Sequence, residues 1–166
     1  MQKVQDNILL TAQVHVDVKA NQTVTVNVDL EAPSHLFRRI RIEGFMETTD
    51  YEFAAAAYPH CVNAIEGIVD LDPGTATHKT KTFECACDDA VGKLYVTCDL
   101  QSDDSVKVSV KLRCYNSDEA SGDDYSQAQI NSFVVAPDQT WSGWIYTDDD
   151  NYAEANFSVT NRTNQS

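Results

Sequence analysis

Polar and apolar residues alternate with a period of two along most of the chain. The clearest example covers residues 10–18, and the alternation resumes over residues 24–30 after a turn at Asn21-Gln22. Because successive side chains of a β-strand point to opposite faces, this pattern predicts a strand pair with one solvated face. Helical periodicity is nearly absent. Residues 51–58, with their consecutive alanines, are the best helical candidate, and we interpret them as a strand with small inward residues.

The same alternation continues in further segments, which clusters of Gly, Pro, Asn and Asp separate. The predicted strands span residues 36–46, 60–71, 77–87, 93–100, 105–115, 127–136, 140–147 and 152–160. Short strands with turns every 8–12 residues, roughly, are typical of two-layer β proteins. We therefore predict an all-β fold: an antiparallel β-sandwich of jelly-roll or C2-like type with about 10 strands. A closed barrel is the alternative.

Size and charge restrict the organisation and the partners. The 166 residues fit one domain, which we place at residues 1–160, followed by a flexible polar tail over 161–166. The formal charge of −14 repels phosphate backbones, so we expect no nucleic-acid partner. No apolar run approaches the roughly 20 residues of a membrane-spanning helix. The first ten residues do not resemble a signal peptide. The localisation therefore stays unknown, and an extracellular or viral surface is still compatible with the sequence.

Four of the five cysteines, Cys85, Cys87, Cys98 and Cys114, share strand parity with Val, Leu and Phe residues. Cys61 shares parity with the apolar residues of its own strand. Free cysteine behaves as a small buried hydrophobe, so we expect mostly reduced core thiols. One or more disulfides, or a zinc site formed by the first four, are alternatives. The zinc site is disfavoured, because a strand spacing of about 4.8 Å and a rise of about 3.3 Å per residue place the four sulfurs too far apart for one tetrahedral ion. The odd count favours a reducing compartment.

Three predicted loops are rich in aspartate, and two strands separate each loop from the next. Since each antiparallel strand reverses the chain, these loops emerge at one end of the domain, together with His35 and His60. Clustered loop carboxylates predict a weak Ca²⁺ site. A solvated acidic surface that keeps a β protein soluble is the simpler alternative. The candidate metal ligands are Asp88, Asp89, Asp118, Asp123, Asp124, Asp148, Asp149 and Asp150.

Residues 117–128, which include Gly122-Asp123-Asp124-Tyr125, resemble the acidic loops of calcium-dependent lectins, although too few ligand positions match to assign a family. Catalytic motifs are absent from the sequence. None of the four histidines lies in a metalloprotease-type motif, and no Gly-rich phosphate loop is present. We therefore expect no enzymatic activity. A pair of carboxylates of the glycosidase type keeps a hydrolase as a third hypothesis.

Both tryptophans lie in the predicted strand 140–147. Trp141 shares one strand face with Ile145, and Trp144 shares the other with Tyr146. One pair must point away from the core unless both faces are covered by the sandwich or by a subunit contact. An exposed Trp-Tyr pair is a platform on which a sugar ring can stack. The candidate ligand-binding residues are Trp144, Tyr146 and Tyr152.

Four Asn-x-Ser/Thr sequons, at Asn21, Asn156, Asn161 and Asn164, suggest a eukaryotic or viral surface context. The sequence therefore predicts a non-enzymatic, lectin-like binding module for a glycan or protein at a cell surface, with a role in adhesion. Calcium at the acidic loops would assist this binding. The alternative is a structural subunit of an assembly, such as a capsid, fibre or inclusion protein. A homo-oligomer fits either hypothesis.

Overall fold

The computed structural model describes residues 2–5, 8–11, 37–50, 59–116, 125–147 and 151–163. The chain divides into two units, residues 1–35 and 36–166. In the first unit, β1 (Gln2–Gln5) and β2 (Ile8–Thr11) form an antiparallel pair. Most of the strand pair predicted over 10–30, and the strand predicted over 51–58, lie outside the described residues.

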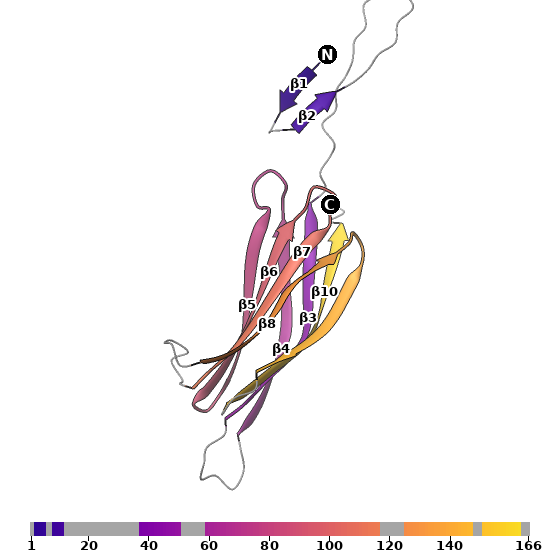
Figure 1. The fold of residues 1–166 in the computed structure, drawn as a ribbon. Coiled ribbons are helices and arrows are strands. Elements are labelled where there is room, and N and C mark those ends of the chain that lie inside the picture. Colours follow the sequence, from indigo (N-terminus) through magenta and orange to yellow (C-terminus); the bar gives the residue numbers. More distant parts are fainter. Residues whose placement is uncertain are drawn as a thin grey trace, which may run out of the picture. The chain divides into compact units, whose positions relative to one another are not determined.

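The second unit is an antiparallel β-sandwich (Figure 1). Its described residues form eight strands, in sheet I with the order β4-β3-β10-β9 and sheet II with the order β5-β6-β7-β8. This confirms the all-β sandwich, with eight strands in its two sheets rather than about ten. The strands are β3 (Arg38–Thr49), β4 (His60–Leu71), β5 (His78–Cys87), β6 (Ala90–Leu100), β7 (Val106–Tyr115), β8 (Tyr125–Val135), β9 (Thr140–Tyr146) and β10 (Tyr152–Thr163).

Hydrogen-bonded pairs join strands that are consecutive in the sequence, with one exception. β10 pairs with β9 on one side and with β3 on the other, in a register that runs from Thr49↔Tyr152 to Arg38↔Thr163. The first and last strands of the sandwich are therefore neighbours. Among the described residues, no helix is long and apolar enough to cross a membrane.

The core lies between the two sheets and follows directly from the alternation in the sequence. In β7, Val106, Val108, Val110, Leu112 and Cys114 are all buried, with at most 1% of each residue exposed. The intervening residues of this strand point to the opposite face. Sheet I contributes its own inward residues, among which are Ile40, Ile42, Phe157 and Val159.

A disulfide between Cys61 and Cys87 corrects the prediction that Cys87 is a free thiol. Cys61 is the second residue of β4 in sheet I, and Cys87 is the last residue of β5 in sheet II. The bond therefore connects the two sheets. No local pattern in the sequence indicates this pair, because β4 and β5 belong to different sheets. Cys85, Cys98 and Cys114 are buried thiols, as predicted. Burial raises the pKa of the Cys98 thiol to about 12.

One sequon asparagine, Asn161, is a buried structural residue. Its Nδ2 atom donates hydrogen bonds to the backbone oxygens of Asp104, at 3.1 Å, and Val135, at 3.0 Å. These contacts attach β10 to the turn before β7 and to the end of β8. Beside them, the buried guanidinium of Arg38 forms an ion pair of 3.0 Å with Asp104. Asn156, in another sequon, is exposed on the opposite face of β10.

Candidate functional site

Of the eight predicted metal ligands, the structure describes only Asp88 and Asp89. Asp88 and Asp89 form the exposed turn between β5 and β6, and Asp88 has a φ of 51°. The Asp89 amide donates to Oδ2 of the buried Asp50, at 3.2 Å. The ends of β5, β7 and β9 lie at the lower end in Figure 1. The other candidates lie outside the described residues: Asp118, Asp123, Asp124, Asp148, Asp149 and Asp150.

Of the two histidines predicted at this end, His35 also lies outside the described residues. His60 begins β4 opposite Thr49, and its Nε2 lies 2.6 Å from the Glu47 carboxylate. Within the described ranges, no group of three or more His, Cys, Asp or Glu side chains is placed to hold a metal ion.

Sheet I carries an exposed aromatic strip, which consists of the three predicted ligand-binding residues Trp144, Tyr146 and Tyr152. The Trp144 and Tyr146 rings stack with centroids 4.6 Å apart and an interplanar angle of 24°. The Tyr152 ring lies 6.4 Å from that of Tyr146. Trp144 is 54% exposed and Tyr146 is 44% exposed. Trp141, on the other face of β9, instead stacks inward on Phe133.

Glu154 on β10 fixes the orientation of the aromatic strip. Its Oε2 accepts a hydrogen bond from Trp144 Nε1, at 3.2 Å, and another from the Tyr152 hydroxyl. The register explains this contact, because Glu154 lies directly opposite Tyr146, between the two donors. The rings are therefore held in place before any ligand arrives, which reduces the entropy lost on binding.

A shallow hollow of about 300 Å³ lies on the same face beside the strip. The register places Phe45, Asn156 and Trp144 side by side across β3, β10 and β9. Tyr146 covers one face of the Trp144 indole, and no other described aromatic ring stacks on the indole. The hollow combines one aromatic wall with hydroxyl, amide and carboxylate groups. Its lining residues are Glu43, Gly44, Phe45, Ser142, Asn156, Phe157 and Ser158.

The outer face of sheet I is also the more apolar of the two outer faces. Most of the large hydrophobic side chains that are exposed in the described residues lie on it. Strand alternation puts them on one side of the sheet. This face can therefore accept either the apolar side of a sugar ring or another protein surface. The residues are Phe45, Val62, Ile68, Trp144 and Tyr146.

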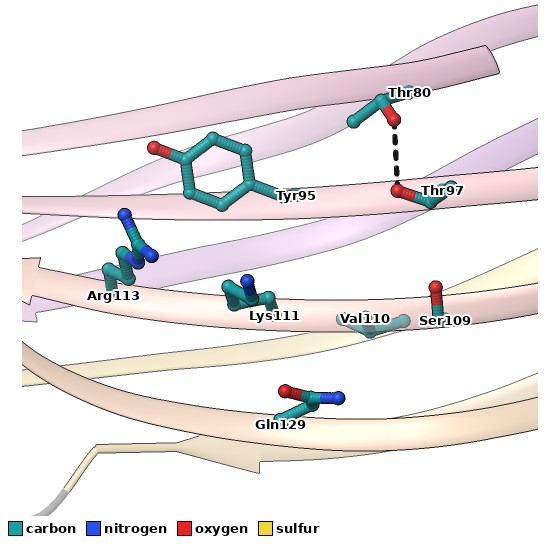
Figure 2. A pocket seen from close by; sticks show the side chains of 8 residues that line it. All are labelled: Thr80, Tyr95, Thr97, Ser109, Val110, Lys111, Arg113 and Gln129. Carbon is teal, nitrogen blue, oxygen red and sulfur yellow. Dashed lines mark hydrogen bonds between the residues drawn. The ribbon is translucent and has the colours of Figure 1, made fainter.

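The outer face of sheet II contains a polar groove with a volume of about 360 Å³. Figure 2 shows that its side chains come from all four strands of the sheet. The Oγ1 atoms of Thr80 and Thr97 are hydrogen-bonded at 2.9 Å. At Ser109 the register between β7 and β8 shifts, and such bulges often border binding sites. The groove is lined by Thr80, Tyr95, Thr97, Ser109, Val110, Lys111, Arg113 and Gln129.

Arg113 is held at one end of the groove by aromatic and polar contacts. Its guanidinium carbon lies 4.2 Å from the ring centroid of Tyr125 and 5.9 Å from that of Tyr95. Its Nε donates to Gln127 Oε1 at 2.9 Å, and its Nη1 donates to the Tyr115 hydroxyl at 3.3 Å. A guanidinium has five N–H donors, so donors remain for a ligand.

The two phenols near Arg113, Tyr95 and Tyr115, change each other's pKa, and the nearby cations change both. Burial, together with the hydrogen bond to Tyr115, raises the pKa of Tyr95 to about 12. Burial opposes ionisation of Tyr115 as well, but hydrogen bonds from Arg113 and Tyr95 and the nearby positive charges lower its pKa overall. The bond to Tyr115 raises the pKa of Arg113. At neutral pH this end of the groove therefore presents a cation and a neutral Tyr95 hydroxyl.

The outer face of sheet II is positively charged, although the chain as a whole has a charge of −14. Its two carboxylates already have partners: Glu84 lies 3.2 Å from Lys93, and Asp99 contacts His78. Lys111, half-buried in the groove, has no ion pair or hydrogen bond with the described residues. The outward cations are Lys93, Lys107, Lys111 and Arg113, against the carboxylates Glu84 and Asp99.

The groove was not predicted, because alternating Thr, Lys and Gln residues are indistinguishable from an ordinary solvated strand face. The available signal was the spacing of Lys107, Lys111 and Arg113, which share one face of β7 in an otherwise acidic chain. The comparisons with known proteins assign neither site: the chain matches no known protein family and no curated protein.

Proposed function

We propose that this protein is a non-enzymatic binding module that recognises a glycan on the outer face of sheet I. The observation that carries the proposal is the aromatic strip, in which the exposed Trp144 and Tyr146 rings stack and Glu154 accepts hydrogen bonds from Trp144 and Tyr152. A sugar ring has an apolar face that stacks on an indole and a rim of hydroxyls that needs hydrogen-bonding partners. The free face of Trp144 and the polar groups of the adjacent hollow offer both.

The charges and dimensions of the face favour a glycan over a protein ligand. A hollow of about 300 Å³ lies at the lower limit of small-ligand pockets, which measure about 300–1,000 Å³. Its carboxylate, from Glu43, forms an ion pair of 2.6 Å with Arg41 and can accept hydrogen bonds from the hydroxyl groups of a neutral sugar. We therefore place a neutral saccharide here, and the absence of enzymatic activity stays part of the proposal.

We propose a simpler arrangement of strands than the predicted jelly-roll or C2-like sandwich. A jelly roll contains two Greek keys, in which strands pair across long connections. Here each sheet pairs strands that follow one another in the sequence, apart from the β3–β10 closure. We propose an up-and-down sandwich, which presents two broad outer faces to ligands.

Assistance by calcium also remains a prediction. Of the eight candidate ligands, the structure describes only Asp88 and Asp89, at the end of the sandwich rather than on the aromatic strip. In this proposal the glycan contacts sheet I directly, so chelation of divalent ions leaves at least the aromatic contacts in place.

The aromatic strip predicts the outcome of a binding experiment with an array of neutral glycans. The wild-type protein should bind at least one class, and Trp144→Ala should weaken that binding about tenfold or more, since removal of a central tryptophan is costly at interfaces. Val134→Ala is the matched control, because Val134 is 62% exposed but lies on sheet II. Absence of binding to every glycan, or equal binding by the Trp144 variant, would refute the proposal.

The apolar surface of the same face supports a second candidate, the structural subunit of an assembly. Val62 and Ile68 are 57% and 53% exposed, and a sugar site does not explain them. Sedimentation of the free protein distinguishes the two functions. A monomer that binds a glycan supports the binding module. A large oligomer that Val62→Lys dissociates, without any glycan binding, supports the structural subunit.

A further inference from the structure

We propose that the polar groove on sheet II is a second binding site, which takes an acidic saccharide through Lys111 and Arg113. The site is separate from the aromatic strip, since it lies on the other sheet of the sandwich. Its strand face has more cations than carboxylates, so the proposal goes beyond the recognition of a neutral glycan on sheet I.

The positive charges of the groove are available to a ligand. The half-buried ammonium group of Lys111 is left without a carboxylate partner by the described residues, whereas Lys93 is paired with Glu84. Arg113 is held between Tyr125 and Tyr95 and retains unused N–H donors. Charge-assisted hydrogen bonds from such groups to a carboxylate or sulfate are roughly twice as strong as neutral ones.

The remaining lining is suited to the hydroxyl groups of a sugar rather than to a bare anion. The hydroxyls of Thr80, Thr97 and Ser109 each donate and accept hydrogen bonds, and Gln129 adds an amide. The groove is larger than a single inorganic anion requires, at about 360 Å³. Tyr95 contributes an aromatic surface beside the two cations, as Figure 2 shows.

The charge of the surroundings favours the same class of ligand. A chain with a charge of −14 repels anions at long range. The cations of the groove can therefore attract an acidic ligand only over short distances. At physiological ionic strength, charges are screened beyond about 8 Å, and the distant carboxylates then matter little in the groove. A neutral sugar would gain only hydrogen bonds to its hydroxyl groups from Lys111, whereas an acidic one also gains an ion pair.

Calorimetric titration of the full chain tests the proposal with three probes: a trimer of galacturonic acid, the matched neutral galactose trimer, and inorganic sulfate. We expect the acidic trimer to bind at least about tenfold more tightly than either of the others, which is the order of one charge-assisted hydrogen bond. Binding should weaken as salt is added. Equal affinity for the neutral trimer or for sulfate, or failure of the acidic trimer to bind, would overturn the proposal.

Variants locate the site and separate it from the strip. Lys111→Gln should reduce affinity for the acidic trimer about tenfold, and Lys111→Arg should retain most of it, because the charge is kept. Lys107→Gln is the control, since Lys107 is an exposed cation of the same strand face outside the groove lining. Trp144→Ala should leave the acidic trimer unaffected. An equal loss from Lys107→Gln, or a loss from Trp144→Ala, would contradict the assignment.

Discussion

Individual residues on β10 show how chemically similar sequence motifs acquire different roles. Asn156 and Asn161 are both sequon asparagines, separated by an odd number of positions, so they face opposite sides of the strand. Asn156 lies exposed between Phe45 and Trp144, whereas Asn161 is fully buried and hydrogen-bonded to two backbone oxygens. A modifying enzyme can reach only the first of these side chains in the folded protein.

Substitution of Asn161 should therefore destabilise the fold. Asn161→Ala removes the donor to the buried oxygens of Asp104 and Val135, and we expect a loss of about 1–3 kcal/mol in the free energy of unfolding. Asn156→Ala, the exposed sequon control, should stay within about 0.5 kcal/mol of the wild type. Urea unfolding measures both. Equal stability of the two variants would show that the Asn161 contacts contribute nothing.

Residue parity also explains what could be predicted of the candidate sites. The parity of β9 placed Trp144 and Tyr146 on the face opposite Trp141, and the structure has this arrangement. Glu154 and the hollow could not be predicted, because they reach the strip only through the register between β9 and β10. For the same reason the groove on sheet II, which combines four strands, has no local signature in the sequence.

At the level of the strands, the turns are stabilised by aspartates whose side chains replace backbone partners. Oδ1 of Asp103 accepts hydrogen bonds from the Ser105 hydroxyl and amide in the turn between β6 and β7. Asp72 accepts similar bonds from Thr75 and Gly74 in the turn between β4 and β5. These bonds lower the pKa of both carboxyl groups.

The two turns predict a specific loss of stability in acid. A carboxyl group whose pKa is lower in the folded protein contributes stability above its unfolded pKa of about 3.9, and this contribution is lost as the pH falls through the folded value. The double variant Asp72→Asn with Asp103→Asn should melt below the wild type at pH 7. Its melting temperature should then fall less steeply between about pH 5 and pH 2. Parallel pH profiles would contradict this origin.

Most strand boundaries were predictable from alternation and turn residues. β4 has the predicted bounds, and β7 differs from its prediction by one residue. β10 continues to Thr163, beyond the predicted residue 160, because the apparently polar Asn161 faces inward and continues the buried pattern. The pairing between strands was harder to predict from the sequence, since no local pattern indicates that β3 pairs with β10.

For the whole molecule, the bond between Cys61 and Cys87 changes the inference about its environment. The odd cysteine count favoured a reducing compartment, whereas this bond between the sheets is typical of proteins from an oxidising one. Its partners lie 26 residues apart, and their Cα atoms are separated by 5.4 Å, within the usual range for a disulfide. The compartment could not be predicted, because only the folded geometry brings the two strands together.

Thiol counting tests this bond. Without reductant, the unfolded protein should show the three thiols of Cys85, Cys98 and Cys114, and after reduction it should show all five. In the native state labelling should be slow, because these thiols are buried. Cys61→Ala with Cys87→Ala should lower the free energy of unfolding by about 3 kcal/mol, as expected for a loop of this length. Five thiols without reductant would exclude the bond.

The pairing of β10 with β3 also determines when the sandwich can be completed on the ribosome. Of the strands of the sandwich, the ribosome synthesises β3 and β4 first, then every strand of sheet II, then β9, and β10 last. At about 5–20 residues per second, the stretch between β3 and β10 takes about 5–20 s to synthesise. Throughout this interval the nascent β3 has a bare edge, which invites pairing with other chains. We therefore expect that protection of this edge during synthesis raises the yield of folded protein.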